Sequence, residues 1–225
     1  MAATEQSFDA APLTWRDGNV PVSVRFDDPY FSLQGGLAET GHVFLAGNGL
    51  PARLKDGFRV AELGFGTGLN LLATAQAWQG AGRISYTSFE AYPMAAPDMA
   101  RALAVFPEVA GMAAELAGFW DAGRREFSLG QVDVRVIVGD ATNTLPAWDG
   151  LADAWYLDGF SPAKNPALWS DEMMQAVAWH TARGGTFASY TAAGHVRRAL
   201  AAAGFDVERR PGFGHKRHMT AGMLR

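Results

Sequence analysis

The sequence predicts an α/β fold, with a doubly wound parallel sheet covered by helices on both faces. From Phe58 onward, short apolar runs typical of buried strands alternate with longer stretches of helical periodicity. That alternation is the pattern of strand–helix–strand units in a parallel sheet. A glycine-rich turn, Gly64 to Gly68, separates the first apolar run from the first predicted helix, as in folds that bind nucleotides at this point.

Length and composition are those of a single globular domain. The 225 residues are 48% hydrophobic and 19% charged, which excludes a disordered chain. No apolar run approaches the roughly 20 residues that a membrane helix needs, and Met1–Ala11 lacks the features of a signal peptide. The sequence has no cysteine, and its five histidines are scattered. We therefore expect a cytoplasmic protein with no membrane segment, no disulfide and no metal site.

Charge is distributed unevenly along the chain. The net charge is −4, which argues against indiscriminate binding of nucleic acid. From His195 to Arg225, however, there are seven lysines and arginines and only two acids, so this tail carries +5. A basic C-terminal face on an acidic body suits a selective polyanion binder, but an ordinary solvated surface explains the same charges equally well. The candidate contacts are Arg197, Arg198, Arg209, Arg210, Lys216 and Arg217.

Residues 1–50 are predicted to form a small β-rich extension that covers one face of the main sheet, with the main domain over residues 51–225. Thr14–Arg16 and Pro21–Phe26 are typical of short strands, and Asp17-Gly18-Asn19 between them is typical of a hairpin turn. No change in composition marks a linker between the two regions. We therefore expect one domain overall.

The first strand of the main domain and the glycine turn form the predicted ligand-binding motif. Phe58–Leu63 is a short apolar run, and a helix is predicted to open at Leu69. Glycine allows the sharp turn and the close approach of a ligand, and the unpaired N–H groups of the helix start offer it hydrogen bonds. With Glu62 upstream, the spacing Gly64-x-Gly66-x-Gly68 resembles the first motif of class I S-adenosylmethionine-dependent methyltransferases. An NAD site is the alternative, although Leu69 stands where the dinucleotide fingerprint has its third glycine.

Acidic residues follow three later strands. Glu90 ends the predicted strand Ile84–Phe89, where a carboxylate can accept hydrogen bonds from both ribose hydroxyls of a nucleoside; a helix cap or surface acid is the alternative. Asp158 comes directly after a predicted strand, and Asp140 follows another with Gly139 between them. Because the carboxyl ends of parallel strands meet at one edge of a sheet, we expect these three acids and the glycine turn to line one rim.

The remaining elements alternate in the same way. Predicted helices cover Pro97–Val105, Pro107–Ala117, Pro166–Arg183 and Ala193–Ala203. Predicted strands cover Asp133–Val138, Ala152–Leu157, Thr186–Tyr190, Phe205–Arg210 and Met219–Leu224. Gly184-Gly185 is expected to terminate the helix Pro166–Arg183, because glycine is the usual residue just past a helix end.

The stretch that follows Ala152–Leu157 is the most specific in the sequence. It is Asp158-Gly159-Phe160-Ser161-Pro162-Ala163-Lys164-Asn165-Pro166-Ala167-Leu168-Trp169. Together with the glycine motif and with Gly212-Phe213-Gly214-His215-Lys216-Arg217-His218-Met219, it closely resembles the tRNA 5-methylaminomethyl-2-thiouridine methyltransferases. The domain of that family also forms the N-terminal half of a bifunctional wobble-uridine enzyme. The resemblance runs from about Trp15 to the C-terminus.

The resemblance implies a class I methyltransferase fold (a Rossmann-like doubly wound sheet), S-adenosyl-L-methionine as methyl donor, and methylation of the 5-aminomethyl group of (2-thio)uridine at wobble position 34 in the tRNA anticodon loop. Asp158 would then be the catalytic residue that orients the amine. The cofactor site would comprise Glu62, Gly64, Phe65, Gly66, Thr67, Gly68, Asn70, Glu90, Asp140 and Ala141, with Tyr30 and Phe31 closing the pocket. The substrate-binding residues would be Phe160, Lys164, Phe213, Lys216 and Arg217, with core packing as the alternative for the aromatic ones.

The bifunctional members of the family add a flavin-dependent oxidase that removes a carboxymethyl group first. The resemblance therefore implies a stand-alone methyltransferase that takes the aminomethyl form from a separate flavin-dependent oxidase. Two other functions compete with this one. A methyltransferase of small amines is disfavoured by the basic tail, and a non-catalytic RNA-binding module is disfavoured by the intact Gly64 turn and Asp158.

Overall fold

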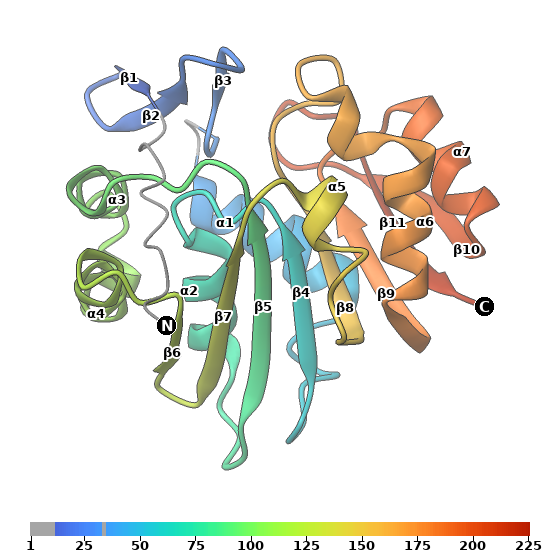
Figure 1. The fold of residues 1–225 in the computed structure, drawn as a ribbon, viewed down its shortest axis with the longest axis horizontal. Coiled ribbons are helices and arrows are strands. Elements are labelled where there is room, and N and C mark those ends of the chain that lie inside the picture. The colour runs from blue at the N-terminus through green and yellow to red at the C-terminus, as the bar shows by residue number, and fades with distance from the viewer. Residues whose placement is uncertain (1–11, 33–34) are drawn as a thin grey trace, which may run out of the picture.

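Eight strands form one central sheet in the computed structural model, which describes residues 12–32 and 35–225 (Figure 1). The order across the sheet is β10-β11-β9-β8-β4-β5-β7-β6. The strands are β4 Arg59–Leu63, β5 Ile84–Glu90, β6 Glu126–Leu129, β7 Val132–Val138, β8 Ala152–Leu157, β9 Thr181–Ser189, β10 Phe205–Pro211 and β11 His218–Leu224. The predicted doubly wound sheet is therefore confirmed.

The sheet is mixed rather than wholly parallel. Strands β7, β5, β4, β8 and β9 run in one direction, whereas β6 is antiparallel to β7 and β11 is antiparallel to both β9 and β10. The chain goes from β4 outward through β5 and β7, and then returns to β8 on the other side of β4. The order reverses at β4 and β8, and the carboxyl ends of strands at such a point form the crevice in which ligands bind.

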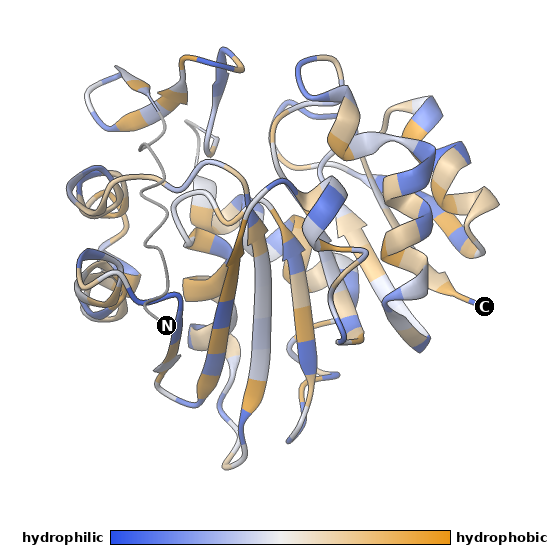
Figure 2. Cartoon of the chain, viewed as in Figure 1, coloured by the Kyte–Doolittle hydropathy of each residue, from blue (hydrophilic) through white to orange (hydrophobic). Residues whose placement is uncertain are grey.

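Helices cover both faces of this sheet, in two separate hydrophobic layers. Helices α2 Leu69–Ala77, α3 Ala96–Leu103 and α4 Ala110–Asp121 pack on one face, and α5 Ala141–Thr144, α6 Asp171–Trp179 and α7 Gly194–Ala202 on the other (Figure 1). Strands β4 and β8 are buried on both faces, and most of their residues are apolar. Strand β7 instead alternates hydrophobic and hydrophilic residues, because only one of its faces is covered (Figure 2).

The N-terminal region has a β part and a helical part. Strands β1 Leu13–Arg16, β2 Val20–Ser23 and β3 Asp28–Pro29 form a small antiparallel sheet, which confirms the predicted hairpin. This small sheet lies over the carboxyl edge of the central sheet rather than on its face (Figure 1). Residues 36–48 are helical instead of extended (α1 Gly36–Thr40, a π-helical turn Gly41–Leu45 and a 3₁₀ turn Ala46–Asn48). Val43, Phe44 and Leu45 in this segment are buried in the core. Met1–Ala11, part of the predicted extension, lies outside the described residues.

The predicted long helix Pro166–Arg183 is wrong at both ends, and only Asp171–Trp179 is α-helical. A 3₁₀ helix covers Pro166–Trp169, Ser170 caps α6 by accepting a hydrogen bond from the Met173 amide, and β9 already starts at Thr181. Gly184-Gly185 therefore lies inside a strand and does not end a helix. The pairing of β9 with β8 shifts register at this point, and Gly184 takes φ +72°, so the glycines form a bulge. Strand β6 was not predicted at all.

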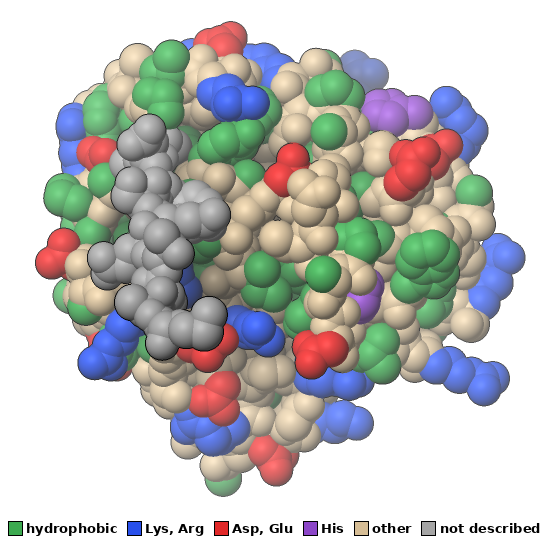
Figure 3. All heavy atoms as spheres, in the orientation of Figure 1, with side chains coloured by type: hydrophobic (Ala, Val, Ile, Leu, Met, Phe, Trp, Pro, Cys, Tyr) green, Lys and Arg blue, Asp and Glu red, His purple; other side chains and the backbone are tan. Residues whose placement is uncertain are grey.

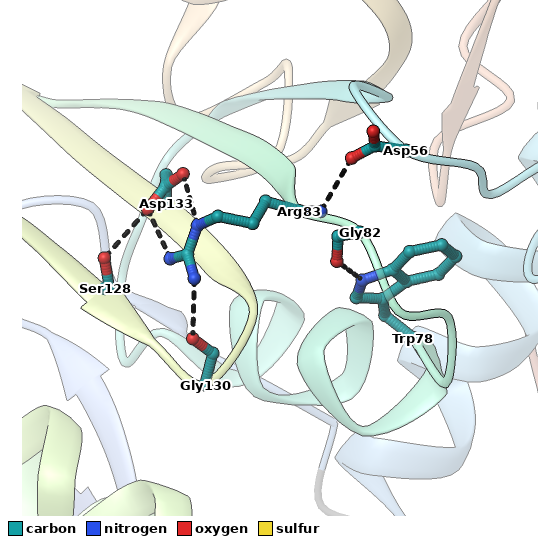
Figure 4. A network of polar contacts seen from close by, with 7 residues as sticks. All are labelled: Asp56, Trp78, Gly82, Arg83, Ser128, Gly130 and Asp133. Carbon is teal, nitrogen blue, oxygen red and sulfur yellow. Dashed lines mark hydrogen bonds and ion pairs between the residues drawn. The ribbon is translucent and has the colours of Figure 1, made fainter.

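A polar network at the amino end of the sheet fixes the register of the hairpin β6–β7 against β5 (Figure 4). The Arg83 guanidinium donates to both carboxylate oxygens of Asp133, which also accepts from Ser128, and the Arg83 amide donates to Asp56. The hydrogen bonds from Arg83 and Ser128 lower the pKa of Asp133 to about 2.

No single helix among the described residues is long and apolar enough to span a membrane. Helix α3 and the segment Pro107–Asp121 together have the required length and composition, but they are bent by 117° relative to each other.

Candidate functional site

A cleft of about 720 Å³ opens along the carboxyl ends of the central strands. Its walls come from the turn after β4, the end of β5, the residues after β8, the small N-terminal sheet, α1 and the β10–β11 turn. This volume lies within the range typical of small-molecule and cofactor pockets. Most of the residues expected to form the site line this cleft: Gly64, Phe65, Gly66, Thr67, Asn70, Glu90, Asp140, Ala141, Asp158, Phe160, Phe213 and Lys216.

The glycine turn has a backbone that only glycine adopts comfortably. Gly64, Gly66 and Gly68 have φ values of +83°, +54° and +79°. A Cβ on Gly64 would lie 3.0 Å from the Cα of Gly159, and one on Gly68 would lie 2.7 Å from a methyl group of Leu116. Gly68 therefore does not line the cleft but allows α2 to start directly behind the turn. The turn presents bare backbone to the cleft.

Glu90 fastens the glycine turn to the end of β5. Its two carboxylate oxygens accept hydrogen bonds from the amides of Gly66, at 2.9 Å, and Tyr92, at 2.7 Å. Burial raises the pKa of Glu90, and these backbone hydrogen bonds oppose that rise. A carboxylate offers about four acceptor positions, so up to two remain for a ligand in the cleft.

Asp158 is held in place by a buried polar network. The Asn70 amide donates to Asp158 and to Glu62, each at 2.8 Å, and accepts a hydrogen bond from the Thr40 hydroxyl. Ser88 donates to the second oxygen of Glu62. Glu62 is completely buried, which raises its pKa well above the ordinary value. Glu62 is thus behind the cleft wall, where it orients Asn70.

The electrostatics of the cleft place the pKa of Asp158 near neutrality. Burial raises it from 3.8 to about 7, although the hydrogen bonds from Asn70 and from the Gly159 amide and the nearby charge of Lys216 lower it. The charge of Glu39 adds to the rise. A carboxyl group with a pKa near 7 exchanges a proton readily at physiological pH, which is a property of general acids and bases.

The small N-terminal sheet closes the outer wall of the cleft. The Phe160 ring stacks on Phe26 with centroids 4.6 Å apart and meets Tyr30 edge to face. The Ser161 amide donates to Asp28, and the Lys164 ammonium contacts Asp27. Lys164 is therefore engaged in holding this wall and does not line the cleft.

Asp140 and Arg217 are both exposed, and only Asp140 contributes to the lining of the cleft. Asp140 is exposed at the rim and caps α5 by accepting hydrogen bonds from the amide and hydroxyl of Thr142. Arg217 is exposed and does not contribute to the lining, whereas its neighbour Lys216 reaches in and pairs with Glu39 at 2.8 Å. In the part of the chain that the structure describes, no three histidine, aspartate or glutamate side chains are grouped to hold a metal ion.

Sequence reasoning missed Glu39, Thr40 and Tyr190, which all line the cleft. Tyr190 directly follows β9, so the same strand-end argument that found Asp158 could have found it. Glu39 and Thr40 belong to α1 in the N-terminal region, and no local motif identifies them.

A family model described as S-adenosyl-L-methionine-dependent methyltransferase matches residues 108–225, slightly more than half of the chain. The chain belongs to this methyltransferase family. Its cofactor is therefore S-adenosyl-L-methionine, and its Rossmann-like fold with the cleft at the strand ends is that of the class I enzymes.

Two relatives of this methyltransferase are bifunctional proteins named for the biosynthesis of tRNA 5-methylaminomethyl-2-thiouridine (MnmC). The protein of Caulobacter sp. (strain K31) is 49% identical over 226 residues, and that of Caulobacter vibrioides is 47% identical over 220 residues. In both cases the match covers 92% of this chain and 37% of the relative, so the chain spans little more than a third of their length. The crystal structure of MnmC2 from Aquifex aeolicus has a TM-score of 0.76 at 24% identity, covering 98% of this chain and 72% of that one, which supports the fold.

Proposed function

We propose that this methyltransferase transfers a methyl group from S-adenosyl-L-methionine to the 5-aminomethyl nitrogen of (2-thio)uridine at the wobble position of tRNA. The observation that carries the proposal is the 49% and 47% identity to the two MnmC proteins over 92% of the chain. The cleft supports it, because the Asp158 carboxyl group, with a pKa of about 7, lines the same cleft as the glycine turn. The proposed setting is the cytoplasm, downstream of a flavin-dependent oxidase activity that produces the aminomethyl group.

The residues of the cleft suit the cofactor. When bound, S-adenosyl-L-methionine supplies an electrophilic methyl group on a sulfonium. The bare backbone of Gly64 and Gly66 would allow its close approach, and the free acceptor positions of Glu90 would take the ribose hydroxyls. Asp140 and Ala141 at the start of α5 would border the base. Phe65 stacks on Trp120 in the core, so its backbone rather than its ring would face the cofactor.

Asp158 would prepare the amine for attack. A primary amine is protonated near pH 7, and only its neutral form has the lone pair that forms the new N–C bond. The Asp158 carboxylate would accept a proton from the ammonium group, and its hydrogen bonds from Asn70 and Gly159 would hold it in one orientation. The closed wall formed by Phe26, Tyr30 and Phe160 would limit access of water to the reacting nitrogen.

The RNA would bind to the basic surface near the cleft. Lys and Arg side chains project along the side of the molecule formed by α7 and β10 (Figure 3). Arg198, Arg209 and Arg217 are exposed, and none of them forms an ion pair with another described residue. Arg210 pairs with Glu208 and is less available. We propose the three exposed arginines as phosphate contacts.

A methylation assay with defined tRNA tests the proposal. The purified protein and labelled S-adenosyl-L-methionine are mixed with tRNA that carries the 5-aminomethyl group, with tRNA that carries the carboxymethylaminomethyl group, and with unmodified tRNA. We expect one methyl group per molecule on the first tRNA only, located on the wobble nucleoside by mass spectrometry. Binding of the cofactor by calorimetry without transfer to the first tRNA would refute the proposed substrate.

A further inference from the structure

The Lys216 ammonium group contacts the side chains of Glu39 and Tyr190 in the cleft that Asp158 also lines. Lys216 comes from the β10–β11 turn, Glu39 from α1, and Tyr190 from the end of β9. The Lys216 Nζ lies 2.8 Å from a carboxylate oxygen of Glu39 and 4.4 Å from the centroid of the Tyr190 ring. Asp158 is close enough for the charges of Lys216 and Glu39 to alter its pKa. One acid and one aromatic face thus contact this ammonium group, and a second acid, Asp158, lines the same cleft.

The acids and the ring belong to the rigid part of the cleft. The Tyr190 hydroxyl donates to the carbonyl of Gly159 at 2.9 Å, and Trp169 packs against the ring edge to face. Thr40, the neighbour of Glu39 in α1, donates to the Asn70 amide that also holds Asp158. The Glu39 side chain is only 11% exposed, so it needs a cation close by.

Lys216, in contrast, enters from the surface. Its side chain is 47% exposed, and it lies on the exposed turn Gly214–Arg217. Glu39 would keep an ion pair and Tyr190 a cation–π contact if another ammonium group took the same place. The end of a lysine side chain is a methylene group bearing an ammonium group, which is the same chemical group as a protonated aminomethyl substituent.

We propose that Glu39, Tyr190 and Asp158 form a receptor for the primary ammonium group of the substrate, and that Lys216 fills this receptor until the substrate enters. The inference rests on the proposed function and adds to it the residues that recognise the amine. The entering ammonium group replaces the Lys216 ammonium group, so Glu39 stays paired throughout. The displaced Lys216 turns to solvent, and Asp158 then faces the nitrogen whose proton it accepts.

Two substitutions at the receptor test this inference, with Lys55→Met as the matched control. The chain has three lysines, and Lys55 lies outside the cleft. Kinetics with aminomethyl tRNA are measured at about pH 8.5, where Asp158 stays ionised even if loss of the Lys216 charge raises its pKa. Glu39→Gln keeps the shape but loses the charge, so kcat/KM should fall about tenfold or more, as for a lost charge-assisted hydrogen bond. Affinity for S-adenosyl-L-methionine by calorimetry should stay the same, which also shows that the variant is folded.

Lys216→Met distinguishes a lysine that occupies the receptor from a lysine that binds a phosphate of the tRNA. Removing the competing ammonium group should leave kcat/KM equal to or above that of the wild type and of Lys55→Met. A decrease in kcat/KM, together with a weaker salt dependence of tRNA binding, would make Lys216 a phosphate contact and overturn its role in the receptor. A Glu39→Gln enzyme within about twofold of wild type would overturn the receptor itself, since a charged hydrogen bond is worth more than that. If the wild type did not methylate aminomethyl tRNA at all, the proposed function would fail instead.

Discussion

Replacing Asp158 by asparagine should strongly reduce methyl transfer and, above about pH 7, make the folded protein more stable. Burial raises the pKa of Asp158 from 3.8 to about 7. Between these two pH values the Asp158 carboxyl group is protonated in the folded protein and ionised in the unfolded chain. The free energy of unfolding therefore falls as the pH rises from about 4 to 7 and then stays constant. The rise in the pKa of Asp158 corresponds to a decrease of roughly 4 kcal/mol in the free energy of unfolding, and we expect a measured decrease of about 2 kcal/mol because solvent in the cleft screens part of the effect.

Asparagine is neutral at every pH and keeps one acceptor oxygen, as the protonated carboxyl group does, so it can accept from the Asn70 amide or from the Gly159 amide but not from both. Urea unfolding of Asp158→Asn and wild type should therefore give similar free energies near pH 4 and a more stable variant near pH 8. Turnover should fall by about two to four powers of ten, because an amide accepts no proton from the amine. Cofactor affinity should change little.

Asp153, at the start of the same strand β8, provides a control of opposite sign. Burial alone would raise its pKa, but hydrogen bonds from the side chain and amide of Arg59 lower it overall. Asp153→Asn should therefore destabilise the protein near pH 7 by about 1 kcal/mol, an effect that disappears as Asp153 is protonated at low pH. If Asp158→Asn were less stable than wild type at pH 8, the burial argument would be wrong; if its kcat fell less than about threefold, Asp158 would not be the proton acceptor.

The pH profile, the cofactor site and the RNA surface give three further predictions. The kcat/KM of the wild type should increase with pH through an inflection near pH 7. Asn70→Ala should move this inflection to higher pH, because it removes a hydrogen bond that lowers the pKa of Asp158. An unchanged inflection in the variant would show that the titrating group is not Asp158. Glu90→Ala should weaken binding of S-adenosyl-L-methionine by about 1–3 kcal/mol in calorimetry, with Glu90→Gln losing less because it keeps an acceptor; equal affinity in all three proteins would remove Glu90 from the site. A triple variant should weaken tRNA binding and flatten the salt dependence of log K by up to about one unit per contact; it combines Arg198→Ala, Arg209→Ala and Arg217→Ala. The control Arg124→Ala, on the α4–β6 connection, should change neither. Identical salt slopes in the triple variant and the wild type would place the RNA on another surface.

The sequence alone was sufficient for the parts of the site that depend on local structure. The apolar run of β4, the glycines with positive φ and the start of α2 follow one another within a dozen residues, so their chemistry determines their conformation. Glu90 and Asp158 could be placed because each follows a buried strand, and parallel strands bring their carboxyl ends to one edge. Gly184-Gly185 shows where this reasoning fails. Glycine there is compatible with both a helix end and a bulge, and only the pairing of β9 with β8 decides between them.

The tertiary structure decided which distant residues share the cleft. Glu39 and Lys216 are 177 positions apart, and neither belongs to a local pattern that indicates an ion pair. Their meeting beside Asp158 depends on the order of strands in the sheet and on the packing of α1 at its carboxyl edge. The pKa of Asp158 is likewise not a local property. It is the sum of burial, which only the complete fold produces, and of charges contributed by residues from both ends of the chain.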